Sequence, residues 1–218
     1  MTLNSQSLWA ISSQLIKVSF SLLAIAVLSR LITPSDYGEF IKYSAILIVL
    51  IPFIDFALSP IYISRKNVSD GAGDAFFTIN IYISLLCSLL MFSFIYLIYS
   101  GQTKAEWTAV LSLGVLCSGA SQQKIAQLTR EGEYYIYFVI NFISQLASLL
   151  LSIAVIYFFD MPITALCVKF ASEHAVFYFL SVFVFGIKNN MMPVRRLFVF
   201  LQDFKSAGNL LMGRVAES

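Results

Sequence analysis

Charged residues are scarce in this sequence. Lys, Arg, Asp and Glu together make up 12% of the 218 residues, about half of the roughly 25% that is usual in soluble domains. Because a soluble protein of this length needs a polar coat, this scarcity excludes an ordinary cytosolic enzyme and a disordered chain. The formal net charge of +2 is also too small for a phosphate-binding surface, so we expect no nucleic-acid partner.

Residues that bind metals or carry out catalysis are equally sparse. The single histidine cannot build a His-based zinc site. Cys87, Cys117 and Cys167 each lie within an apolar run, and their odd number and spacing suit neither a metal site nor a disulfide framework. No nucleophile motif, paired-carboxylate site or phosphate-binding glycine loop is present. We therefore expect no metal, no cofactor and no catalytic residue, and the protein is not predicted to be an enzyme.

Apolar sequence, in contrast, is abundant. Hydrophobic residues make up 59% of the chain, and a helix needs about 20 predominantly apolar residues to cross the hydrocarbon core of a membrane. Six segments meet this requirement, at about 8–31, 41–63, 75–99, 107–128, 134–159 and 162–187. The sequence therefore predicts an all-α integral membrane protein, with a six-transmembrane-helix bundle over 1–188 and a tail over 189–218.

Two of these segments depart from a simple span. The second contains Pro52 and Pro60, which a spanning helix tolerates when neighbours satisfy the freed carbonyls. We predict one continuous helix there, and Ser35 or Asp36 can cap it. The fourth is the weakest of the six, because polar residues dilute its second half up to Lys124.

The distribution of basic residues predicts the orientation. The loops and tail on the N-terminal side contain Arg65, Lys66, Lys124, Arg130, Lys188, Arg195, Arg196, Lys205 and Arg214. The opposite side contains only Arg30, Lys42 and Lys104. Because cytoplasmic loops carry the excess of Lys and Arg, both termini should be cytoplasmic. The tail has apolar residues at helical spacing among its basic ones, which predicts an amphipathic helix at the cytoplasmic interface.

Polar residues form one stripe on each of four predicted spans. Gln14 and Lys17 lie on the stripe of the first span, and Asn141 and Gln145 lie on that of the fifth. In lipid, such side chains must face other helices or a cavity. The stripes are consistent with a hydrated path through the bundle, to which these four residues would contribute, or with close interhelical packing alone.

Five charged or ionisable residues fall inside the predicted spans: Lys17, Asp55, Lys169, Glu173 and His174. A charge in mid-membrane costs about 3 kcal/mol or more, so each is a candidate functional residue. Lys169 and Glu173 are four residues apart and can pair along their own helix. Lys17 can pair with Asp55 or Glu173, or line a cavity that accepts an anion. His174 is a candidate for proton coupling beside Glu173, or a hydrogen-bonded packing residue.

The stretch from Leu28 to Lys66 carries a distinctive motif. Its residues are Leu28, Arg30, Leu31, Thr33, Pro34, Asp36, Tyr37 and Gly38, then Asp55, Phe56, Ala57 and Leu58, then Arg65 and Lys66. This pattern resembles the N-terminal region of the O-antigen and polysaccharide flippases, within the multidrug/oligosaccharidyl-lipid/polysaccharide exporter superfamily. Ala57 stands where the family usually has glycine. A weaker similarity continues around QLTREGEYYIYFVINFISQ.

The resemblance implies a function and partners. Members of this family move oligosaccharide units, carried on undecaprenyl pyrophosphate, across the bacterial inner membrane for O-antigen or capsule-type polysaccharide. They have two six-helix lobes around a central cavity, and a cationic residue in that cavity suits the pyrophosphate; Lys17 is the best candidate here. A polysaccharide polymerase and chain-length machinery are the partners that this role implies.

The length of the chain matches one lobe only, since family members usually have twelve to fourteen spans. We therefore expect either a truncated member or a half-length transporter that pairs with a second lobe or with itself. The alternatives are an exporter of another cargo on the same scaffold, and a structural or remnant membrane protein that transports nothing.

Overall fold

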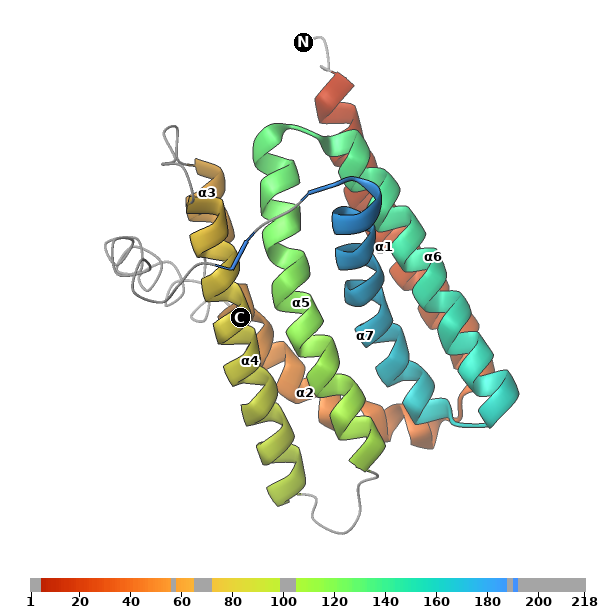
Figure 1. The fold of residues 1–218 in the computed structure, drawn as a ribbon. Coiled ribbons are helices and arrows are strands. Elements are labelled where there is room, and N and C mark those ends of the chain that lie inside the picture. Colours follow the sequence, from red (N-terminus) through yellow and green to blue (C-terminus); the bar gives the residue numbers. More distant parts are fainter. Residues whose placement is uncertain (1–4, 56–57, 65–71, 99–104, 188–189, 192–218) are drawn as a thin grey trace.

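The computed structural model describes residues 5–55, 58–64, 72–98, 105–187 and 190–191. Within these ranges the chain forms helices and no strand (Figure 1). The elements are α1 (Ser5–Leu31), α2 (Pro34–Asp55), α3 (Leu58–Ser64), α4 (Ala72–Ile98), α5 (Ala105–Glu131), α6 (Tyr134–Phe159), α7 (Pro162–Phe179) and the π-helix η1 (Leu180–Val184). Of the described helices, α1, α2, α4, α6 and the continuous α7–η1 stretch are long and apolar enough to cross a membrane. The protein is therefore an all-α, multi-pass membrane bundle, as predicted.

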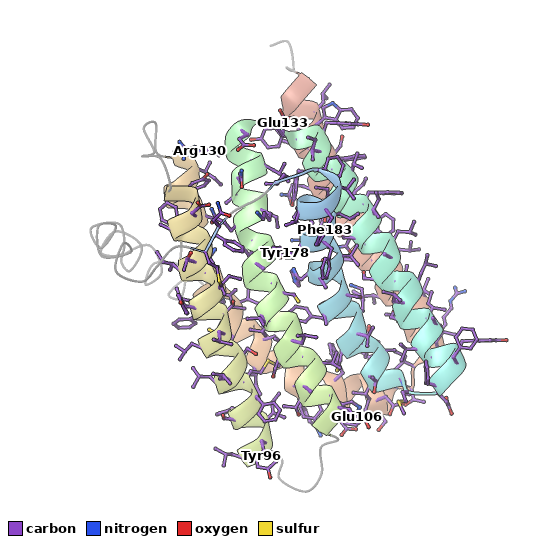
Figure 2. The ribbon with its side chains drawn as sticks, viewed as in Figure 1. Tyr96, Glu106, Arg130, Glu133, Tyr178 and Phe183 are labelled. Carbon is purple, nitrogen blue, oxygen red and sulfur yellow. The ribbon has the colours of Figure 1, made fainter. Side chains whose placement is uncertain are left out.

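The helices α4, α5, α7 and α6 stand side by side in that order, and α1 lies along α6 (Figure 1). Helix α2 crosses behind this row and contacts α4, α5 and α7. The long helices alternate in direction. Figure 2 places Arg130 and Glu133 at one end of the bundle and Tyr96 and Glu106 at the other. The start of α1, the start of α4, the α5–α6 connection and the end of α7 all lie at the Arg130 end (Figure 1).

Helix α5 is as long as its neighbours but more polar, and it falls short of the hydropathy that the other long helices reach. It lies between α4 and α7, so much of its surface faces protein. Two glycines permit this close packing. A Cβ at Gly114 would come within 2.7 Å of the Phe170 ring on α7, and one at Gly119 would collide with Ser84 on α4. A helix enclosed in this way needs fewer lipid-compatible side chains, which explains the weak signal of the fourth predicted span.

The second predicted span, 41–63, is wrong at both ends. Helix α2 begins at Pro34 because the Thr33 hydroxyl accepts the Asp36 N–H at 3.3 Å and donates to the Asp36 carboxylate at 2.7 Å. Thr33, rather than Ser35 or Asp36, therefore holds the cap, and proline suits the first helical position. The helix accommodates Pro52 but ends at Asp55. A separate helix, α3, starts at Leu58, with Pro60 in its first turn, where a missing N–H costs little.

The other boundaries lie closer to the prediction. Helix α6 matches the fifth predicted span, 134–159, at both ends. The sixth predicted span extends to 187, but α7 ends at Phe179 and passes into η1. Gly186 then adopts a left-handed conformation with φ of 66°. The predicted amphipathic tail, 189–218, lies outside the described residues apart from 190–191.

Apolar side chains hold the helices together in clusters. One contains Leu47 of α2, Met91 of α4, Val115 of α5 and Cys167 of α7, each with 4% exposure or less. A second joins α1 to α6 and α7 through Leu28, Leu149 and Leu166. Tyr37 and Phe40 of α2 are partly buried and also pack against this second cluster.

Candidate functional site

A cavity of about 210 Å³ lies between α1, α2 and α7. Its wall is mostly apolar, with Leu28 from α1, Phe40 from α2 and Leu166 from α7. Ser21 and Tyr37 contribute polar groups, and Lys169 and Glu173 contribute charges from α7. The cavity exists because α1 packs on α6, whereas α2 packs on α4, α5 and α7. Two of the five charged or ionisable residues predicted inside the spans therefore meet in one cavity.

The Glu173 carboxylate has two partners. The Lys169 ammonium lies 3.3 Å from Oε2, and the Gln145 amide of α6 donates to Oε1 at 2.5 Å. The side chains of Lys169 and Glu173 are 20% and 21% exposed, and Gln145 is buried. The pair neutralises its own charge, while the amide holds the carboxylate against α6. The helical spacing predicted the contact with Lys169, but nothing in the sequence indicated the one with Gln145.

Lys17 occupies the exposed face of α1, one turn before Ser21, which lines the cavity. No hydrogen bond or ion pair joins it to Glu173 among the described residues. Gln14 is also exposed and borders a shallow apolar groove along α1. Asp55 is the last residue of α2, and its side chain lies outside the described part of the structure. Lys17 therefore stands beside the cavity, and Gln14 faces outward.

Asn141 lies away from the cavity. Its side chain is 6% exposed, and its amide donates to the backbone carbonyl of Ser13 on α1 at 3.4 Å. The serines that follow it on α6 donate to carbonyls of their own helix: Ser144 to Ile140, Ser148 to Gln145 and Ser152 to Leu149. Much of the polar stripe on α6 is thus used for packing, and Gln145 is the member that reaches a charge.

His174 points to another side of α7. Its Nδ1 lies 3.1 Å from the hydroxyl of Ser121 on α5. Its ring packs edge-to-face with the Phe170 ring, with the two ring centroids 5.1 Å apart. Although His174 follows Glu173 in sequence, a step of about 100° around the helix turns it towards α5. The three residues predicted to form an ion pair or to couple protons therefore divide between the cavity, which has Lys169 and Glu173, and the α5–α7 interface, which has His174.

A further buried cation was not singled out from the sequence. The Lys124 side chain has no exposed surface, and its ammonium donates to the carbonyl of Ile187 at 2.7 Å. It also lies 5.3 Å from the centre of the Phe77 ring. The distribution of basic residues places Lys124 on the cytoplasmic side of the membrane, but α5 continues for seven more residues beyond it. A helix end at Glu131 instead of 128 would have indicated that Lys124 lies inside the bundle.

Metal ligands do not come together in the described part of the chain. No three of its His, Cys, Asp and Glu side chains are placed to hold an ion. Cys87, Cys117 and Cys167 are all free thiols.

Comparison with models of known protein families gives a match. A family model described as "Polysaccharide biosynthesis protein" matches residues 27–213, which is most of the chain. Neither the curated proteins nor the solved structures give a match.

Proposed function

The chain belongs to the polysaccharide biosynthesis protein family, and from this premise we propose that it flips lipid-linked oligosaccharide units across the bacterial inner membrane. Family membership and the multi-pass bundle establish a membrane protein of polysaccharide biosynthesis. The proposed cargo is carried on undecaprenyl pyrophosphate, and the proposed activity is transport without a chemical step. Resemblance of the Leu28–Lys66 stretch to O-antigen and polysaccharide flippases supports this cargo.

The observation that carries the proposal is the pair of charges in the cavity between α1, α2 and α7. Lys169 and Glu173 face this space from a helix that is otherwise apolar enough to cross a membrane. Charges at this depth are costly, and in membrane proteins they usually mark the path of a polar or charged substrate. A sugar with many hydroxyl groups needs such hydrogen-bonding side chains along its path.

The size of the cavity argues for a second lobe. At about 210 Å³ it is smaller than the roughly 300–1,000 Å³ of sites that enclose a drug-sized ligand, and an oligosaccharide is larger still. We propose that a second six-helix lobe, in another chain or a second copy, encloses the rest of the path. Lys17, exposed one turn from the cavity wall, would then face the pyrophosphate. The termini would be cytoplasmic, and a polysaccharide polymerase with its chain-length machinery would receive the cargo.

Rescue of a flippase-null bacterium tests this function. The chain is expressed alone and together with the C-terminal lobe of an established polysaccharide flippase, and surface polysaccharide is measured. We expect rescue in at least one arrangement. The Glu173→Gln and Lys169→Gln double variant should lose rescue at equal membrane abundance. Glu106→Gln, an exposed carboxylate at the far end of α5 (Figure 2), is the matched control and should retain it.

Two results would contradict the proposal. Absence of rescue in every pairing would favour a structural or remnant protein. Full rescue by the double variant would show that Lys169 and Glu173 do not serve the cargo.

A further inference from the structure

Small and polar residues line the interface between α4 and α5. At 3.6 residues per turn, their positions on each helix fall within an arc of about 80°. The residues of this interface, called the seam below, are Asn80, Ser84 and Ser88 of α4 and Ser112, Gly119 and Gln123 of α5. Two contacts fix its middle. The Ser88 hydroxyl donates to the Ser112 carbonyl at 2.8 Å, and a Cβ at Gly119 would collide with Ser84.

Asn80 and Gln123 face each other across the next turn of the seam. The two helices run antiparallel (Figure 1), so four residues back from Ser84 and four residues on from Gly119 lead to the same level. The backbone carbonyl of Asn80 would itself lie 3.0 Å from a Cβ at Gly119. This level lies on the side of Gly119 that leads to the Arg130 end of the bundle.

Both carboxamides are buried without partners. Neither side chain has any exposed surface. Within the described part of the chain, none of their four polar side-chain atoms has a hydrogen-bond partner. An unpaired amide in an apolar interior is unfavourable, and almost all buried polar groups in folded proteins are hydrogen-bonded. The two carboxamides together therefore indicate a bound species in the seam.

The chemistry of a carboxamide narrows the ligand. Each one presents an oxygen that accepts and an NH₂ group that donates two hydrogen bonds. A cation would satisfy only the two oxygens, and an anion only the two NH₂ groups. Water both donates and accepts, and a buried water typically makes about three hydrogen bonds to polar groups around it. The Ser84 hydroxyl, which donates to the Ile81 carbonyl at 3.0 Å, retains lone pairs as a further acceptor.

Gln127 connects this pair to the end of the bundle. It lies one turn beyond Gln123 on α5, and its Nε2 donates to the carboxylate of the exposed Glu131 at 3.1 Å. Its Oε1 is buried and has no hydrogen-bond partner among the described residues. In the other direction, Gly119 packs directly on Ser84. The polar track is therefore continuous from Glu131 to Asn80 and is closed beyond it.

We propose that Asn80 and Gln123 bind buried water between α4 and α5, and that this water exchanges with the Arg130 end of the bundle along Gln127. The site is separate from the cavity between α1, α2 and α7, which α5 does not line. It also lies about 160° around α5 from Ser121, the partner of His174. It does not depend on which cargo the protein moves.

Solid-state NMR tests the site in the full chain, labelled with ¹⁵N and ¹³C and held in lipid bilayers. The experiment measures the rate at which magnetisation passes from water protons to the side-chain nitrogens of Asn80 and Gln123, assigned through their own side-chain carbons. The backbone amide of Met91, also fully buried on α4 but in an apolar cluster, is the dry reference. We expect transfer to both carboxamides to be several-fold faster than transfer to Met91.

A substitution on the polar track tests the route of exchange. Gln127→Leu replaces the buried acceptor by an apolar group of similar size, so it should slow the transfer from water to Asn80. Gln122→Leu is the matched control, because it makes the same change on α5 at a position about 140° around the helix from Gln127. It should leave the transfer to Asn80 unchanged.

Two results would overturn the proposal. Transfer to Asn80 and Gln123 as slow as transfer to Met91 would show that the carboxamides pair with each other in a dry interface. Unchanged transfer in Gln127→Leu, or equal slowing by Gln122→Leu, would overturn the route. The first comparison uses the unaltered protein, so it does not depend on the folding of a variant. Gln127→Met replaces Gln127→Leu if the latter does not fold.

Discussion

The hydrogen bond between Gln145 and Glu173 holds the cavity carboxylate against α6, and removing it tests whether this contact stabilises the protein. Gln145→Leu removes the only amide that reaches the Glu173 carboxylate from α6 among the described residues. Leucine has a similar size, so the substitution leaves little empty volume. In this variant the Glu173 carboxylate retains the Lys169 ammonium at 3.3 Å, and 21% of the Glu173 side chain remains exposed. It therefore loses one of two partners without becoming isolated.

The expected cost follows from two sets of magnitudes. A hydrogen bond to a charged group contributes roughly 1.5–3 kcal/mol to the stability of soluble proteins. Hydrogen bonds between helices in a membrane average about 0.6 kcal/mol and reach about 1.7 kcal/mol. Because this bond is short and charged but leads to a partly exposed carboxylate, we expect a loss of about 1–2 kcal/mol.

A double-mutant cycle of unfolding free energies measures this value directly. The cycle combines Gln145→Leu with Glu173→Leu in detergent-solubilised protein. Lys169 is affected in the same way on both sides of the cycle, so its contribution cancels. Gln14→Leu, the same substitution on an exposed face of α1, should cost little or nothing. A coupling energy near zero would refute the reasoning, because Gln145 and Glu173 would then not support each other.

The remaining predictions concern packing, capping and the cargo. Gly119→Ala should lower the unfolding free energy by about 1–3 kcal/mol, because its Cβ would collide with Ser84. Gly38→Ala should not lower the unfolding free energy, because a Cβ there meets nothing within 4 Å. Equal effects of the two substitutions would contradict the packing described for α4 and α5. Thr33→Val should cost about 1 kcal/mol through loss of the α2 cap, and an unchanged melting temperature would argue against that cap. Lys17→Ala should reduce polysaccharide rescue at unchanged membrane abundance. Full rescue would show that Lys17 is not needed to bind the pyrophosphate.

Sequence periodicity and hydropathy predicted the helices well because a membrane imposes a minimum apolar length on each span. Helix α6 was predicted at both ends, since its apolar run is bounded by polar residues at both ends. Hydropathy predicts the second span poorly, because it does not show that proline can start a helix as well as interrupt one. Pro34 in fact starts α2, and Pro60 sits in the first turn of a separate helix. Local capping by Thr33 decided the boundary, and hydropathy carries no information about it.

The site was predictable only where it depends on one helix. The contact of Lys169 with Glu173 follows from a four-residue spacing, which is fixed by helical geometry. The contact of Glu173 with Gln145 depends on how α6 and α7 are rotated against each other. The burial of Lys124 depends on where the chain runs after α7, because the acceptor is the carbonyl of Ile187. Neither relation can be read from the periodicity of a single segment.

Site-specific photo-crosslinking tests the central claim most directly, namely that the cavity between α1, α2 and α7 receives a lipid-linked oligosaccharide. Benzoylphenylalanine is placed at Tyr37, in the cavity wall, or at Tyr157, which is 82% exposed on α6. Both proteins are irradiated in bacterial membranes that contain the radiolabelled precursor. The account predicts capture of the precursor from position 37 and little from position 157. Equal capture at both positions, or capture at 157 alone, would contradict it.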